Sequence, residues 1–407
     1  MLLHAAPDDD AIARDNGFID ACGRREYFLA AAATLLFSTT TTNSALIAVV
    51  FQRAGFPLQT IGQLIGVLAI TVLAATLASG YITARLGAVR ASHVAMAFAV
   101  VGVGSLAWTR EHFWGAMGSR LAWGVGVGLF LGPMNLYMQS RLTPKRFVYL
   151  VTAFSAMIPL ALAIAPPIGE QVLNHFGERA LFITGAVPAL VAILITANLR
   201  ALPSPPAPSG LGLVSAWRAW HFLPAMTLVI GGSQFGYLTS YLAPALESHK
   251  IMLGWFFLPM TAAMIGCRVF AMRRLASLHP RTLAASGLVG CSLSLAAIAG
   301  AQGPLLVAAS GVALGLGNSM MYPVMSAWFG RFASRSDGGG VQAIVASAFY
   351  VGIYWAPWPL ATLIGFYGFS GAALMLAGVG LAGALVLAGS RVDGSRDAGP
   401  HGDSAGR

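Results

Sequence analysis

The chain has 407 residues, of which 57% are hydrophobic and only 9% are charged. An ordinary soluble domain carries about 25% charged residues, so this composition excludes a water-soluble fold. The net charge of +10 does not indicate a nucleic-acid partner, because the cations stand singly between apolar blocks and form no basic stripe. The three cysteines, Cys22, Cys267 and Cys291, are far apart, so we expect no disulfide framework, no metal site and no cofactor.

Long apolar runs divide the chain into two sets of helices, since about 18 or more apolar residues can span a hydrocarbon core roughly 30 Å thick. The first six predicted helices lie near 28–50, 59–83, 91–109, 113–139, 147–171 and 180–199. The second six lie near 221–243, 252–272, 282–300, 304–328, 341–363 and 366–390. Between the sets, the stretch 201–211 is too rich in proline for a helix, which predicts a semi-rigid linker.

The predicted fold class is an all-α membrane protein with twelve transmembrane helices in two six-helix bundles. The expected segments are an N-terminal tail 1–27, a first bundle 28–199, a linker 200–220, a second bundle 221–390 and a C-terminal tail 391–407. A weak internal repeat supports this division. When the sequence is aligned with itself at an offset of 191 residues, Ala165 and Gly177 of the first half coincide with Ala356 and Gly368 of the second.

The distribution of cations predicts the topology, because lysine and arginine are retained on the cytoplasmic side. If the N-terminus lies inside, the outer segments carry only Arg53, Arg110, Arg179 and Lys250, and nearly all other cations lie inside. The acidic N-terminus does not resemble a cleaved signal peptide, so we expect the first helix to act as its own insertion signal. The expected location is a bacterial inner membrane, with both termini in the cytoplasm.

The connection between the second and third helices carries a recognisable motif. Gly80, Arg85, Gly87 and Arg90 stand in an arrangement that resembles the cytoplasmic gate loop of the major facilitator superfamily of secondary transporters. The sequence departs from the family pattern at Ala84, where the family has an aspartate. The resemblance implies that this loop is a cytoplasmic gate, although the missing acid leaves its usual charge cluster incomplete.

The fourth and fifth helices extend the resemblance. Arg120, followed by Gly124 and Gly126, is similar to a family motif whose arginine is linked to proton coupling. Within the fifth helix, the segment from Ala165 to Glu170 is similar to a motif seen in antiporters. The resemblance therefore implies that Arg120 and Glu170 take part in proton coupling. The alternatives are that Arg120 snorkels to the membrane surface, that Glu170 is simply hydrated, and that the glycines only pack helices.

Polar side chains inside the spans indicate where a solute could bind. The resemblance implies that helices one, four, seven and ten line a central cavity, to which the aromatic eleventh helix could contribute. The candidate cavity residues are Asn43, Asn135, Gln234, Tyr237, Asn318, Tyr322 and Tyr350. Hydrogen bonding between helices is an equally good explanation for these groups.

We expect a monomeric secondary transporter that works by alternating access and exports a small organic or amphiphilic compound in exchange for protons. Its partners would be the solute, protons and the lipid bilayer. An importer on the same fold is one alternative, and a polytopic membrane enzyme or a non-transporting sensor is another. We expect no enzymatic activity, because acids are few within the spans and no ATP-binding loop motif occurs.

Overall fold

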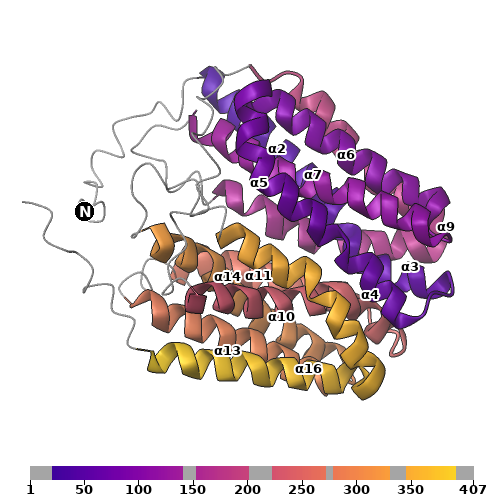
Figure 1. The fold of residues 1–407 in the computed structure, drawn as a ribbon, viewed down its shortest axis with the longest axis vertical. Helices are drawn as coiled ribbons and strands as arrows, with labels where there is room; N and C mark the ends of the chain where they lie inside the picture. The colour runs from indigo at the N-terminus through magenta and orange to yellow at the C-terminus, as the bar shows by residue number, and fades with distance from the viewer. Residues whose placement is uncertain (1–20, 141–152, 201–221, 272–277, 331–344, 391–407) are drawn as a thin grey trace, which may run out of the picture.

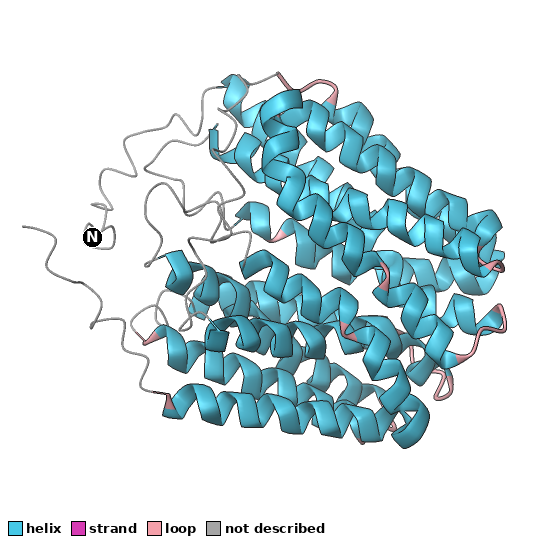
Figure 2. Ribbon diagram, viewed as in Figure 1, coloured by secondary structure: helices cyan, strands magenta, loops and turns pink. Residues whose placement is uncertain are grey.

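The computed structural model describes residues 21–140, 153–200, 222–271, 278–330 and 345–390. Within these ranges every regular element is a helix (Figure 2), which confirms the all-α fold. Figure 1 shows the N-terminal helices, in indigo and magenta, packed as one bundle beside a second bundle of C-terminal helices in orange and yellow. The expected linker and C-terminal tail, and most of the expected N-terminal tail, lie outside the described residues.

The first bundle begins earlier than the sequence predicts, at Ala21 instead of residue 28. Its elements are α2 (Ala21–Thr42), η1 (Asn43–Leu46), α3 (Ile47–Arg53), α4 (Leu58–Gly66), α5 (Leu68–Leu86), α6 (Ala88–Thr109), α7 (Phe113–Ser140) and α9 (Met157–Thr196). The first three form one span, and α4 and α5 form the next, interrupted only at Val67.

The second bundle has the same general plan. Its elements are α10 (Phe222–Glu247), α11 (Gly254–Gly266), η4 (Cys267–Ala271), α13 (Pro280–Ala299), α14 (Pro304–Gly330), η5 (Val351–Trp355) and α16 (Pro357–Gly389). Both η4 and η5 are π-helical turns. Such turns are rare and often occur at functional sites.

Two glycine bends complete the helix count. Within the part of the chain that the structure describes, eight apolar helical stretches are long enough to span a membrane, and two of them are 44 and 45 residues long. These two bend at Gly177 (φ 81°) and Gly368 (φ 71°), in backbone conformations that glycine adopts without a Cβ penalty, so each makes two spans. The remaining spans are α10 and α11 with η4. The described residues thus contain the twelve predicted spans.

The two ends of the spans differ in their connections. We call the end with the loops at 54–57, 110–112 and 248–253 and the bends at Gly177 and Gly368 the distal end, and the opposite end, with the turn at Gly87, the proximal end. Exposed aromatic side chains, including Trp108, Trp114 and Phe366, lie near the distal end. This position is typical of the aromatic belt at a membrane interface.

The buried core is shared between the bundles at one end only. Among the described residues, the largest cluster of buried apolar side chains lies in the distal half and joins both bundles, for example through Phe51 and Tyr241. The other two clusters each stay within one bundle, around Phe130 in the first and Met325 in the second. The described parts of the bundles are therefore packed together distally and form separate cores proximally.

Candidate functional site at the bundle interface

The bundles approach each other closely at a helix pair that we call the distal seam, formed by Gly62 and Gly66 of α4 with Trp358 and Ala361 of α16. A Cβ atom placed on Gly62 would lie 2.5 Å from the Cβ of Ala361, and one on Gly66 would lie 2.8 Å from the Cβ of Trp358. Glycines at four-residue spacing let two transmembrane helices touch in this way. Larger side chains at these positions would prevent the seam from closing.

Polar contacts also cross the interface between the bundles. Arg53 Nη2 donates to Glu247 Oε1 at 2.6 Å and links the ends of α3 and α10. The backbone N–H of Leu253, the N-cap of α11, donates to Glu170 Oε2 of α9 at 2.8 Å. Thr261 Oγ1 donates to the carbonyl oxygen of Pro159 at 2.9 Å. Glu170 therefore caps a helix of the opposite bundle, where a carboxylate also complements the helix dipole.

Arg120 of α7 lies directly behind the seam and is only 1% exposed. Its Nε donates to the carbonyl oxygen of Leu64 at 3.1 Å, and its Nη2 donates to that of Ile65 at 3.2 Å. These carbonyls belong to the last turn of α4, where a helix end leaves acceptors without helical donors. The guanidinium is therefore held inside the protein and does not snorkel to the membrane surface.

Aromatic side chains extend the site from Arg120 across the interface. The guanidinium carbon lies 4.7 Å from the ring centroid of Trp123, which is also 1% exposed. On the other side of the interface, the Tyr354 hydroxyl in η5 interacts electrostatically with Arg120. The Tyr354 ring lies 5.8 Å from that of Tyr350, and Tyr350 in turn interacts with Tyr322 of α14. The three tyrosines are partly exposed and form a row that leads away from Arg120 toward the proximal end.

The structure does not bring Arg120 and Glu170 together. Arg120 binds carbonyl oxygens of α4, whereas Glu170 binds the N-terminus of α11.

Three of the predicted cavity residues make contacts inside their own bundles. Gln234 Nε2 donates to Ser292 Oγ at 2.8 Å, and the Tyr237 hydroxyl donates to the carbonyl oxygen of Phe369 at 2.6 Å. The Asn43 side chain packs between two helical segments of α9, against the glycines at 169 and 185. In this structure these three side chains make contacts between helices, which was the alternative to solute binding.

The other predicted cavity residues differ in how much of each residue is exposed. Asn135 of α7 is exposed, Asn318 of α14 is 7% exposed, and Tyr322 and Tyr350 are half-buried. Only the two tyrosines join the row that leads to Arg120. Trp123 was not predicted as a site residue, whereas Tyr354 belongs to the aromatic eleventh helix that the sequence indicated as a possible contributor to the cavity.

The expected gate motif lies at the proximal turn between α5 and α6. Gly87 has a positive φ of 78° and forms the turn itself, as its place in the motif requires. Arg85 lies over the Tyr81 ring at 4.6 Å, and both Arg85 and Arg90 are exposed. Gly80 lies on the exposed surface of α5. Neither arginine pairs with a described acid, as the alanine at position 84 leads one to expect.

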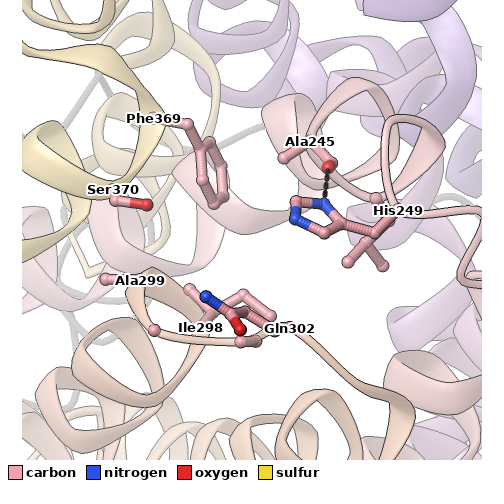
Figure 3. Close-up of a pocket in the computed structure, with 10 residues that line it drawn as sticks. Ala245, His249, Ile298, Ala299, Gln302, Phe369 and Ser370 are labelled. Carbon is pink, nitrogen blue, oxygen red and sulfur yellow. Dashed lines mark hydrogen bonds between the residues drawn. The ribbon is translucent and has the colours of Figure 1, made fainter.

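Two cavities open near the distal end. One, of about 350 Å³, lies between the bundles and is lined by Gln52, Tyr241 and apolar side chains. The other, of about 190 Å³, lies within the second bundle (Figure 3), where His249, Gln302 and Ser370 surround it. No group of three metal-binding side chains occurs among the described residues. The second cavity involves one bundle alone, so it is not placed to sense their relative movement.

Comparison with known proteins identifies the family. A sequence profile of the Major Facilitator Superfamily matches residues 28–300. The chain belongs to this superfamily. It is therefore a multi-pass membrane transporter for a small-molecule solute.

Solved transporter structures share the fold at low sequence identity. The nucleoside transporter NupG superposes with a TM-score of 0.74 at 14% identity, over 90% of this chain and 98% of that one. A D-xylose-proton symporter gives 0.71 at 16% identity, over 89% and 97%. The xylose transporter XylE from E. coli, in a partially occluded inward open conformation, gives 0.70 at 16% identity, over 90% and 99%. These likenesses support the twelve-helix fold.

Proposed function

We propose that this superfamily transporter exports a small organic or amphiphilic compound in exchange for protons, by alternating access between two bundles. The observation that carries the proposal is the shared distal core combined with separate proximal cores. If the proximal end faces the cytoplasm, as the cations favour, this conformation is closed to the outside. Transport then requires the distal seam to open.

Glu170 is our candidate proton carrier. Its carboxylate accepts the N–H of Leu253 across the interface. A hydrogen bond to a charged carboxylate is stronger than one to a neutral carboxyl group, so protonation would weaken this contact. The carboxylate form thus binds the N-terminus of α11 more tightly than the protonated form does, and so strengthens the contact between α9 and α11 across the interface. For exchange, Glu170 would take up a proton while the distal end is open to the outside and would lose it toward the cytoplasm after that end has closed, so that protons move inward.

Arg120 has a different part in this proposal. An arginine keeps its proton at any accessible pH, so it cannot be the carrier. Its bonds to Leu64 and Ile65 hold the last turn of α4, the helix that forms one side of the seam. We infer that Arg120 links events in the site to the position of α4.

The experiment uses everted membrane vesicles, whose interior corresponds to the outside of the cell. A ligand would first be found by thermal-shift screening of the purified protein. When respiration acidifies the vesicle interior, an exporter that exchanges protons should accumulate the labelled ligand there. Glu170→Gln should abolish the dependence on the pH gradient, whereas Glu111→Gln, at an exposed acid near the same end, should retain it. Accumulation that ignores the gradient in the parent protein would contradict proton exchange.

A proton-coupled importer is the second candidate, because one structural neighbour is named as a D-xylose-proton symporter. The same vesicles separate the two directions. An importer would accumulate the ligand in right-side-out vesicles with an acidic exterior and would not accumulate it in acidified everted vesicles.

A further inference from the structure

We propose that Arg120 and Trp123 form an anion subsite, so that the transported solute carries a carboxylate or a comparable negatively charged group. This inference rests on the proposed transport function and names the chemical class of its substrate. It starts from two buried polar groups that the fold leaves without partners.

Both side chains hold a hydrogen-bond donor that meets no acceptor among the described residues. Arg120 uses Nε and Nη2 on α4, but its Nη1 is buried and unpaired. The indole Nε1 of Trp123, in the side chain stacked on the guanidinium, is also buried and unpaired. Arginine and tryptophan side chains have donors only, so the missing partner must supply acceptors.

The described acids do not neutralise Arg120, because each lies beside another group. Glu247 pairs with Arg53, and Glu111 and Glu178 both pair with Arg110. Glu170 caps α11, and Glu26 lies 4.0 Å from Arg200. A buried charge without a counter-charge is strongly unfavourable, and carbonyl oxygens supply only partial negative charge. An anionic ligand would complete the site electrostatically.

The surroundings restrict the shape of this ligand. Tyr354 of the opposite bundle interacts electrostatically with Arg120, and Tyr350 and Tyr322 continue the row toward the proximal end. Their partly exposed rings offer flat apolar surfaces, and aromatic pairs are favourable at such distances. A flat organic acid could place its carboxylate at Arg120 and its ring along the tyrosines. We therefore infer an aromatic carboxylate rather than a sugar or a cation.

The test measures binding to the full-length protein in detergent, so that it does not depend on transport. The probes are benzoate, phenylacetate and indole-3-acetate, each compared with its primary amide, which has the same shape but no charge. At least one carboxylate should raise the thermal unfolding midpoint while its amide does not. Equal effects of acid and amide, or no effect of any acid, would overturn the proposal.

An inorganic anion could use the same donors, and a chloride titration distinguishes this source. If chloride stabilises the protein as well as the best carboxylate at equal concentration, the site holds a small inorganic anion and the proposed solute class is wrong. If the carboxylate binds and no flux is seen, the subsite stands and the transport proposal fails, so the two failures are distinguishable.

Variants locate the binding. Arg120→Gln should weaken carboxylate binding about tenfold or more, because a charged hydrogen-bond partner is lost. Trp123→Phe keeps the ring but removes the Nε1 donor, so it should weaken binding without unfolding the protein. The control is Trp114→Phe, in the same helix but 79% exposed, which should leave binding unchanged. Unchanged binding in both site variants would overturn the proposal.

Discussion

The distal seam makes a quantitative prediction about conformational equilibrium. We consider Gly62→Ala, which adds one methyl group where α4 meets α16. The added Cβ would lie 2.5 Å from the Cβ of Ala361 and 3.1 Å from the carbonyl oxygen of Trp358. Carbon atoms in contact normally lie about 3.5–4.0 Å apart, so the two helices must separate by about 1 Å or more. The substitution therefore penalises the conformation in which the seam is closed.

The size of the effect follows from the cost of overpacking. An extra methyl group in a well-packed region costs about 1–3 kcal/mol. This cost falls on the closed seam and not on the open one. Since about 1.4 kcal/mol changes an equilibrium tenfold, the population with an open seam should rise about 5- to 150-fold.

The assay measures how fast a buried cysteine in the seam reacts with a fluorescent maleimide. Ile61, 3% exposed and next to Gly62, is replaced by cysteine in a protein whose own three cysteines are changed to serine. The labelling rate of this I61C protein should rise in proportion to the open population. The control is Gly118→Ala in α7, where no atom lies within 4 Å of the added Cβ. If Gly62→Ala labels no faster than this control, the seam does not limit opening and the reasoning is wrong.

Three further predictions concern contacts around the site. Arg53→Ala should raise I61C labelling less than about fivefold, because the Arg53–Glu247 pair is 37% and 49% exposed and such pairs contribute about 0.2–1 kcal/mol. A larger rise would show that this pair is a principal latch. Arg110→Ala should lower the thermal unfolding midpoint, because it removes the charged hydrogen bonds from Arg110 to Glu178 and to the carbonyl oxygen of Ala107, and such bonds are worth about 1.5–3 kcal/mol each. Gln234→Met should lower the stability by only about 0.6 kcal/mol, the average for an interhelical hydrogen bond in a membrane protein. If it instead abolished binding of an identified carboxylate without loss of stability, Gln234 would belong to the solute site.

The sequence predicted the number and order of the spans because bilayer thickness fixes the length of an apolar run. It also predicted the repeat: Gly177 and Gly368, matched by one shift of the sequence, both bend the chain at positive φ. The sequence placed the start of α2 too late, because the first turns of this helix contain charged residues, which a hydropathy criterion assigns to a loop. Charge and apolar length therefore determine the overall architecture well and the helix ends less well.

The sequence could not determine which way most polar side chains point. In a soluble helix the apolar face identifies the core, but these helices are hydrophobic on every side and give no such direction. The spacing of Gln234, Tyr237 and Tyr241 correctly indicated a shared face. It could not show that this face meets Ser292 and other groups of the same bundle. The sequence could not predict the contacts of Arg120 for another reason. Its acceptors are backbone carbonyls that lie free of helical hydrogen bonds because α4 ends just before α5 begins.

The position of Arg120 suggests how solute and proton could act on one element. An anion bound to the free Nη1 of Arg120 would draw the guanidinium toward the tyrosine row, and would so weaken its bonds to the carbonyl oxygens of Leu64 and Ile65 in the last turn of α4. A ligand can shift a conformational equilibrium only by its difference in affinity for the two states, and a change from 1:99 to 99:1 needs a difference of about 10⁴-fold. No single contact here supplies that difference. The glycine contacts, the Arg53–Glu247 pair and the Glu170 cap all hold the same distal end closed. Weakening one of them therefore lowers the free energy that the remaining changes must supply to open this end. Solute binding from the proximal side would favour an open seam, and proton release from Glu170 would favour a closed one. This is the order of events that exchange of an organic anion for protons requires.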